Sequence, residues 1–479
     1  MGKPKKRFRW PLRSKIEVAL RRSKRFLARL KKVREISYDS AYFHGRGFDA
    51  RYSTDTGVEL RLRSYLADAE LDALESVDVD RYAKIWGLVH FGRLFAPHLP
   101  LRIRVRALSL DPADEERFRT WCIGILGEAL YINRLPAELD LTFSGERLAP
   151  RQGAANLGER AVLMSGGGKD SAVMGEVLKA LDVPFRWFCI REGSEAPTRE
   201  LAKIAGSAPP ASSAWCNEIR GESGFEEFNP AHLRWIHRRQ KKRDRGRRWL
   251  SLMSHVVEGC FQAELSGSRY VVVGNERSAN EGNGIYIGDL EVNHQYSKSY
   301  AFEEEFAVFL AKYLHPELSY ASLLMPLSEL QIAKIFTSYP QYFPVFRSCN
   351  LRLGTTKWCL DCPKCAFVFL MLSAFVDGAQ VSEVFGADLL SDSGHVQTFL
   401  DLCGLGRHKP LECVGEAGEC LLALYLASQR RTAAPLHPRL AAALPSDEEA
   451  RALQDRILGE FNDDNGLPPQ WDAKLRQMV

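Results

Sequence analysis

The stretch AVLMSGGGKDSAVM, residues 161–174, limits the possible folds more than any other part of the sequence. Four apolar residues lead into a glycine-rich turn, and a helix-like pattern follows the turn. Such a turn lets backbone N–H groups and the N-terminus of the next helix approach phosphate oxygens. The stretch therefore predicts a strand, a phosphate-binding loop and a helix.

Two common phosphate-loop patterns do not fit this stretch. A Walker A loop needs Ser or Thr after its Gly-Lys pair, but Asp170 stands there, and Leu163 occupies the position of its first glycine. The Rossmann pattern G-x-G-x-x-G needs a third glycine, but Ser171 stands at that position when the pattern starts at Gly166. The sequence therefore indicates neither a phosphoryl-transfer loop nor a redox-cofactor loop.

The remaining pattern, S-G-G-G-K-D-S, resembles the PP-loop of ATP pyrophosphatases, usually written S-G-G-x-D-S, with one extra residue. The resemblance implies an enzyme that transfers AMP from ATP to a substrate oxygen and releases pyrophosphate. Lys169 can neutralise the leaving charge, and Asp170 can hold Mg²⁺ or cap the helix. A glycine-rich turn without a ligand is the alternative. The expected ATP-binding residues are Ser165, Gly166, Gly167, Gly168, Lys169, Asp170 and Ser171.

Strand-like and helix-like segments alternate from residue 161 onward. This alternation predicts βαβ units, and so an α/β fold in which helices flank a parallel sheet and the site lies at the strand C-terminal ends. The resemblance specifies the PP-loop, or adenine nucleotide alpha hydrolase-like, form of this fold. We expect strands at 161–164, 184–190, 214–219 and 269–273, and helices at 170–181, 197–205 and 249–265. The predicted regions are a basic arm (1–36), an N-terminal α+β domain (37–150), the ATP-binding domain (151–325), a helical region with a cysteine cluster (326–435) and a C-terminal tail (436–479).

Four cysteines in SCNLRLGTTKWCLDCPKC have the spacing C-x9-C-x2-C-x2-C. Thiolates at this spacing suit tetrahedral Zn²⁺, and a site made of four cysteines leaves no open coordination position. The pattern predicts a structural zinc site, with an iron–sulfur cluster as the alternative. The expected ligands are Cys349, Cys359, Cys362 and Cys365.

Two polar segments, GNERSAN (274–280) and NHQYSKS (293–299), follow the last predicted strand of the ATP-binding domain. Dense polar side chains beyond a strand end are typical of a site for a highly functionalised substrate. A turn-rich surface hairpin is the alternative, because Asn, Gly and Ser favour turns. The expected substrate-binding residues are Asn275, Arg277, Asn280, Asn293 and Gln295.

Together the loop, the two polar segments, the WCLDCPKC cluster and the chain length resemble the UDP-N-acetylmuramoyl-L-alanyl-L-glutamate epimerase family of peptidoglycan synthesis, over about residues 45–440. The resemblance implies that ATP and Mg²⁺ activate UDP-MurNAc-L-Ala-L-Glu as an acyl adenylate. The terminal L-glutamate is then inverted to D-glutamate, and AMP and pyrophosphate are released.

Inversion requires that a proton leave one face of Cα and return to the other. The candidate groups are His294, Lys298, Glu276 and Cys216, and we favour His294 with either Lys298 or Glu276. Spacing does not rank these groups, and each could instead bind carboxylate or phosphate.

Other functions share part of this pattern. A PP-loop enzyme that acts on tRNA, a 7-cyano-7-deazaguanine synthase-like enzyme that adenylates a small carboxylate, and a nucleotide-sensing scaffold without turnover are the alternatives. The net charge of +5 is uneven, since residues 1–36 hold fifteen Lys and Arg against two acids and the rest carries −8. An acidic body without a basic, aromatic platform argues against a nucleic-acid partner.

The basic arm has helical apolar spacing that suits contact with an anionic membrane, or else a solvated or domain-packed helix. A second basic run, 234–248, could bind the substrate's diphosphate or form a solvated loop. The arm is followed by no apolar run of signal-peptide length, and no segment is long enough to span a bilayer, so we expect a cytoplasmic protein with reduced thiols. The oligomeric state is not predicted.

Overall fold

A computed structural model of the chain describes residues 33–66, 71–95, 102–154, 156–190, 194–221, 224–227, 251–349, 357–406, 412, 414–431 and 434–479. The basic arm up to residue 32 and the second basic run at 234–248 lie outside the described residues, as do the contacts predicted for them.

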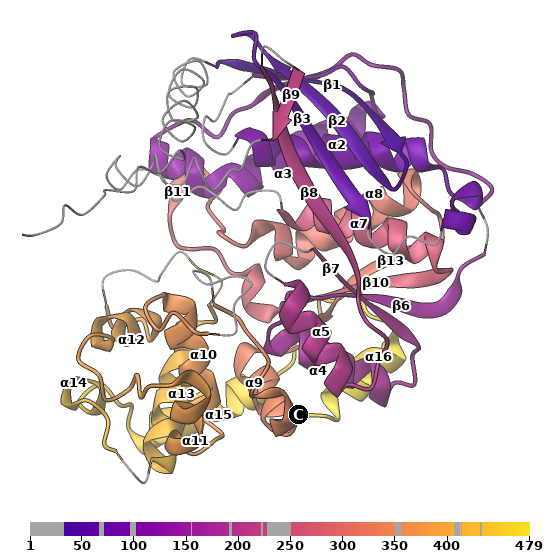
Figure 1. Cartoon of the computed structure of the whole chain (residues 1–479). Coiled ribbons are helices and arrows are strands. Elements are labelled where there is room, and N and C mark those ends of the chain that lie inside the picture. Colours follow the sequence, from indigo (N-terminus) through magenta and orange to yellow (C-terminus); the bar gives the residue numbers. More distant parts are fainter. Residues whose placement is uncertain are drawn as a thin grey trace, which may run out of the picture.

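Most strands of the described residues belong to a single sheet of eleven strands (Figure 1). These strands are β1 (Glu35–His44), β2 (Gly47–Thr54), β3 (Glu59–Leu66), β4 (Arg102–Val105), β5 (Asp140–Phe143), β6 (Gly158–Met164), β7 (Phe185–Ile190), β8 (Ala211–Gly221), β9 (Gly224–Glu227), β10 (Ser268–Glu276) and β13 (Ser319–Leu324). The order is β13-β10-β6-β7-β8-β3-β2-β1-β4-β5, and β9 pairs with β8. Two short strands, β11 (Tyr286–Ile287) and β12 (Leu290–Glu291), form a separate hairpin.

The sheet has a parallel part and an antiparallel part. Strands β13, β10, β6, β7 and β8 are parallel neighbours. From β8 the sheet continues antiparallel through β3 and β2 to β1, and β4 and β5 are again parallel. The prediction of an α/β fold with a mostly parallel sheet is confirmed, and the sheet runs through both the 37–150 and the 151–325 segments.

Helices flank the sheet and form the C-terminal region. The longer helices that precede β13 in the chain are α2 (Val79–Phe95), α3 (Pro112–Asn133), α4 (Lys169–Ala180), α5 (Glu195–Ile204), α7 (Ser251–Leu265) and α8 (Tyr300–Tyr313). The C-terminal helices are α9 (Glu329–Thr337), α10 (Pro363–Ser373), α11 (Gly378–Phe385), α12 (Val396–Leu402), α13 (Ala417–Arg430), α14 (Pro438–Ala441), α15 (Asp447–Gly459) and α16 (Pro469–Arg476). Figure 1 shows α10 to α15 gathered in one helical body beside α9, which confirms the predicted helical region.

Two apolar cores lie on opposite faces of the parallel strands. Side chains alternate between the faces of a strand, so Val162 and Val271 enter one core while Leu163 and Val272 enter the other. The first core includes residues of α2, α3, α7 and α8, and the second joins α4 to the C-terminal helices. Strands buried on both faces explain why β6 and β10 read as continuous apolar runs.

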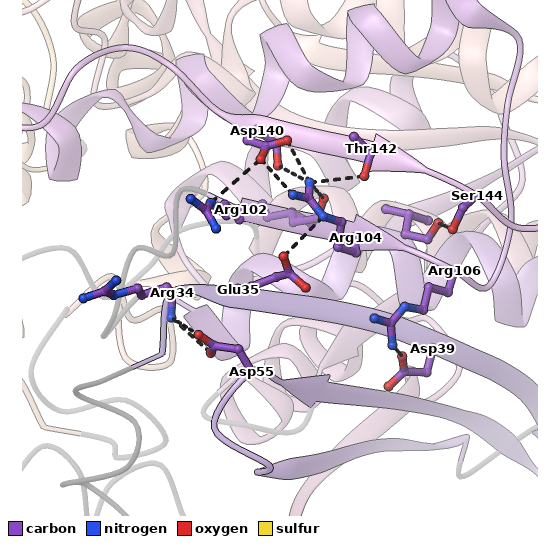
Figure 2. A network of polar contacts seen from close by, with 12 residues as sticks. Arg34, Glu35, Asp39, Asp55, Arg102, Arg104, Arg106, Asp140, Thr142 and Ser144 are labelled. Carbon is purple, nitrogen blue, oxygen red and sulfur yellow. Dashed lines mark hydrogen bonds and ion pairs between the residues drawn. The ribbon is translucent and has the colours of Figure 1, made fainter.

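Charged side chains line a polar face at the β1–β4–β5 edge (Figure 2). The guanidinium of Arg104 forms two hydrogen bonds with Asp140, at 2.7 and 2.8 Å, and lies 3.3 Å from Glu35. Arg106 pairs with Asp39 at 3.2 Å on the same face. Cross-strand pairs of this kind fix strand register, although partly exposed pairs add little to stability.

Glu303 of α8 gives the first testable prediction. Its carboxylate accepts a hydrogen bond from Ser322 of β13, and burial raises the pKa of Glu303 from 4.5 to about 7. The folded protein therefore binds a proton that the unfolded chain releases between these pH values, so stability falls as pH rises through this window. Glu303→Gln should remove that fall, which is on the order of 3 kcal/mol.

Urea unfolding of the wild type and Glu303→Gln at pH 5 and pH 8 measures this difference. Glu304→Gln, at the exposed neighbouring position, is the matched control and should keep the wild-type pH dependence. A Glu303→Gln protein that loses as much stability as the wild type between these pH values would contradict the prediction.

Candidate active site

The predicted phosphate loop connects β6 to α4, as the sequence indicates. Gly167 has a φ of +78°, a left-handed conformation that glycine adopts without steric cost. The loop hydroxyls hold the turn, because Ser165 Oγ accepts a bond from Gly167 N at 3.2 Å and Ser171 Oγ accepts one from Gly166 N at 3.1 Å. Ser165 Oγ also lies 2.8 Å from Thr198 Oγ1 of α5. A Cβ added to Gly166 would meet no described atom within 4 Å, so this side of the loop is open.

Lys169 is fully buried at the start of α4. Its ammonium forms hydrogen bonds with the carboxylates of Asp170 and Glu329. Burial acts to lower the pKa of Lys169, but these two carboxylates outweigh it and hold the pKa above its ordinary value. Glu329 is the first residue of α9, and Lys364 of α10 approaches its other oxygen at 3.6 Å. Lys169 thus joins the glycine-rich loop to the C-terminal helices.

The pKa values of Glu276 and Glu329 are shifted in opposite directions although both side chains are buried. Burial, followed by the charge of Glu329, raises the pKa of Glu276. Burial would also raise the pKa of Glu329, but the cations of Lys169 and Lys364 lower it further than burial raises it. Glu276 accepts hydrogen bonds from Ser278 N at 2.5 Å and Ser278 Oγ at 2.8 Å. Two acidic groups whose pKa values are moved apart suit acid–base chemistry.

The first polar segment continues from β10 into the 3₁₀ helix η2 (Arg277–Asn280). Asn275 Nδ2 donates to Ser322 Oγ at 2.8 Å, and Arg277 Nε lies 3.6 Å from Glu416 beside α13. Asn280 Oδ1 accepts a bond from Tyr300 N at 2.7 Å. These three predicted substrate-binding side chains therefore contact protein partners that set the shape of the loop.

The second polar segment packs against the first. Asn293 Nδ2 donates to Ala279 O at 2.8 Å, and Asn293 Oδ1 accepts from Gln295 N at 2.7 Å. The buried Gln295 precedes the 3₁₀ helix η3 (Tyr296–Lys298), which contacts η2. The charge of Lys298 is one of those that lower the pKa of Glu329, which places Lys298 near the Lys169–Glu329 pair. The β11–β12 hairpin lies between the two segments.

His294 faces α3. Its Nδ1 lies 2.5 Å from a carboxylate oxygen of Glu128, whose side chain is buried, and Asn283 Oδ1 accepts the His294 backbone N–H at 2.6 Å. Cys216, the fourth candidate, lies in β8 opposite Arg63 of β3, in the antiparallel part of the sheet. The structure thus brings Lys298 and Glu276 near Lys169 and gives His294 a carboxylate partner.

Sequence reasoning missed Glu128, Glu329 and Lys364. Lys364 lies within the cysteine motif, and this position was a usable signal. Glu128 is an acid within an otherwise apolar helical stretch, which also hints at a role. Glu329 offers no such signal, because acidic residues are common in the first turn of helices.

The four cysteines of the predicted metal site do come together. Their Sγ atoms lie within 4.8 Å of one another. Cys359 Sγ accepts bonds from Asp361 N and Cys362 N, both at 3.3 Å, and Cys362 Sγ lies 3.4 Å from Cys365 Sγ. Tetrahedral ligands about 2.3 Å from Zn²⁺ would be about 3.8 Å apart. The cluster therefore fits a four-coordinate metal, which supports a structural site.

Comparison with known proteins identifies the family. The MurL N-terminal domain model matches residues 31–211 and 252–323, and the MurL C-terminal domain model matches residues 345–455. The chain belongs to the MurL family. The N-terminal match contains the glycine-rich loop and both polar segments, and the C-terminal match contains the four clustered cysteines.

Curated MurL relatives cover most of the chain. A Micromonospora protein is 32% identical over 74% of this chain and 76% of its own length. A Salinispora tropica protein is 35% identical over 64% of each chain, and a Xanthomonas oryzae pv. oryzae protein is 29% identical over 79% of this chain and 82% of its own. All three are named UDP-N-acetyl-alpha-D-muramoyl-L-alanyl-L-glutamate epimerase.

Among the helices of the described residues, none is both long enough and apolar enough to cross a membrane.

The cysteine cluster gives the second prediction. Cys359→Ser should remove the metal and lower the melting temperature, because metal binding at such a site adds directly to folding stability. Elemental analysis and thermal unfolding measure both effects, with about one Zn²⁺ expected per wild-type chain. Cys403→Ala removes a buried thiol outside the cluster and should keep the metal. Wild-type protein that contains iron and absorbs visible light would favour the iron–sulfur alternative.

Proposed function

We propose that this MurL-family chain is an ATP-dependent epimerase of peptidoglycan precursor synthesis. It inverts the terminal L-glutamate of UDP-MurNAc-L-Ala-L-Glu to D-glutamate. The observation that carries this proposal is the family match across both domains, together with the epimerase name of all three curated relatives. The loop between β6 and α4, with its neighbouring acid–base groups, supports the chemistry.

ATP has a clear role in this inversion. The Cα–H of a glutamate is a weak acid beside an ionised α-carboxylate, because its carbanion would place a second negative charge next to the first. An oxygen of the α-carboxylate attacks the α-phosphorus of ATP, and the bond to the β-phosphate oxygen breaks to release pyrophosphate. The acyl adenylate has lost the carboxylate charge, and its carbonyl accepts the electron pair when the Cα proton leaves.

Two steps complete the reaction. A proton returns to the opposite face of Cα, which inverts the centre. Water then attacks the acyl carbon, and the D-glutamyl carboxylate and AMP separate. For each acyl adenylate that is hydrolysed, one ATP and one water are consumed, and one AMP and one pyrophosphate are formed.

The loop residues from Ser165 to Ser171 would hold the ATP phosphates. Glycines at 166–168 let the backbone approach closely, and the N-terminus of α4 favours negative charge. Asp170 is partly exposed, with 28% of its side chain accessible, and would share Mg²⁺ with the phosphate oxygens. Mg²⁺ would neutralise part of the charge that develops on pyrophosphate.

The proton-transfer roles are assigned to three groups of the polar segments, His294, Lys298 and Glu276. Glu128 accepts the Nδ1 proton of His294, which directs Nε2 of the neutral ring to act as the base. Lys298 and Glu276 are the candidates for the opposite face of Cα, and both interact electrostatically with Glu329. Burial favours the protonated form of Glu276, which is the form that a proton donor requires.

Incubation with ATP, Mg²⁺ and UDP-MurNAc-L-Ala-L-Glu tests the proposal. Chiral analysis should find D-glutamate together with AMP. Folded protein that leaves L-glutamate unchanged would refute the proposed activity.

Ser171→Ala gives the third prediction. The Ser171 hydroxyl fixes the Gly166 N–H in the loop and adds a donor for phosphate, so AMP formation should fall by about 100-fold or more. Quantification of AMP by chromatography measures the loss. Ser382→Ala removes a hydroxyl of α11 that bonds within its own helix, and it should react like the wild type. Normal AMP formation by Ser171→Ala would contradict the assignment of the loop.

The His294–Glu128 pair gives the fourth prediction. His294→Ala should keep ATP–pyrophosphate exchange, which reports adenylation, while Cα deuterium uptake from D₂O and inversion are lost. Glu128→Gln should slow both Cα reactions by about 10- to 100-fold, because it weakens the group that orients the ring. Mass spectrometry of the glutamate and radiolabel exchange measure the two half-reactions.

Glu116→Gln is the matched control, because Glu116 lies on the exposed side of the same helix. It should retain both half-reactions. If His294→Ala epimerises at the wild-type rate, His294 is not the base.

A further inference from the structure

Lys364 links the cysteine cluster to the C-terminal side of the ATP loop. It lies between Cys362 and Cys365 in the first turn of α10, so bound metal would fix its backbone on both sides. Its Nζ lies 3.6 Å from Glu329 Oε1, and the other oxygen of Glu329 bonds to Lys169. The side chains of Lys364 and Glu329 are only 11% and 4% exposed, so water screens this chain of charges weakly.

A second contact joins the same two sites. The backbone N–H of Arg347 donates to Gly167 O at 2.8 Å. A Cβ on Gly168 would lie 2.6 Å from Ser348 Oγ, so Ser348 packs directly on the loop. Cys349, the first ligand of the cluster, follows Ser348 in the chain. The cysteine cluster is therefore connected to the ATP loop through residues next to two of its four ligands, Cys349 and Cys365.

The charges along this connection balance. Lys169 and Lys364 oppose Asp170 and Glu329, so the four groups together add no net charge beside the loop. Without Lys364, the remaining three groups would carry one net negative charge. Without Lys364, Glu329 would also bind the Lys169 ammonium more strongly, in competition with the phosphate oxygens of ATP. Both changes disfavour a polyphosphate anion at the loop.

We propose that the four-cysteine metal centre positions the ATP loop, with Lys364 and Glu329 as positioning residues that carry the coupling to Lys169. The inference rests on the proposed function, because it takes ATP as the ligand of the loop. It assigns to the metal centre a role in nucleotide affinity in addition to its role in folding.

Lys364→Met gives the fifth prediction. The substitution keeps an unbranched apolar side chain and removes the ammonium, which lies 4.9 Å from the centre of the Phe367 ring. In protein verified to contain its metal, the Kd for MgATP measured by calorimetry should rise about tenfold or more. The KM for UDP-MurNAc-L-Ala-L-Glu should change much less. Lys364→Arg should restore most of the affinity, since it restores the charge.

Glu329→Gln tests the charge balance, because a purely structural role of Lys364 would not predict that a second substitution restores MgATP binding. Added to Lys364→Met, it removes the uncompensated negative charge, so the double variant should bind MgATP more tightly than Lys364→Met alone. Lys334→Met, an exposed position on α9, is the matched control and should bind MgATP like the wild type.

The outcomes separate this inference from the proposed function. Wild-type protein that binds no MgATP would refute the ATP-dependent function itself. Wild-type protein that binds MgATP, together with a metal-containing Lys364→Met variant of unchanged affinity, would overturn the coupling alone. Loss of metal in both Lys364→Met and Lys364→Gln would also overturn it, because Lys364 would then serve the metal site and not the loop.

Discussion

The buried ammonium of Lys169 is the interaction on which the rest of the site depends. A lysine with no solvent contact is costly unless its charge is matched, and here Asp170 and Glu329 match it. Asp170 belongs to the loop, whereas Glu329 begins the helix that follows β13. One charge therefore joins the parallel sheet to the C-terminal helices. Glu329 lies between the segments that the two MurL domain models match, so the pair ties the N-terminal segment to the connection between them.

This constraint explains how acidic groups with different roles share one small volume. The cations of Lys169 and Lys364 keep Glu329 ionised, whereas burial and the charge of Glu329 favour the protonated form of Glu276. The proposed chemistry uses the same principle on the substrate, because adenylation removes the carboxylate charge that would oppose a Cα carbanion. In both cases a neighbouring charge decides whether a proton is held or released.

Local patterns made part of the structure predictable. The strand–loop–helix at residues 158–180 and the four-cysteine site follow from short-range spacing, and both are found as predicted. The β1–β2 hairpin was missed because a bulge between Tyr38 and Ser40 interrupts the alternation that marks a strand. The His294–Glu128 and Lys169–Glu329 pairs join positions 166 and 160 residues apart, and no local pattern encodes such contacts. The sequence therefore located the glycine-rich loop and the candidates Glu276 and Lys298, but not Glu128 and Glu329.

Isotope transfer tests the central claim, adenylation of the glutamate α-carboxylate, most directly. UDP-MurNAc-L-Ala-L-Glu with ¹⁸O in that carboxylate would be incubated with ATP and Mg²⁺, and the AMP analysed by mass spectrometry. The oxygen that bridges carbon and phosphorus stays on phosphorus when water attacks the acyl carbon. The account predicts one ¹⁸O atom in each AMP, formed together with D-glutamate. D-glutamate that accumulates while AMP and pyrophosphate remain at background would contradict it.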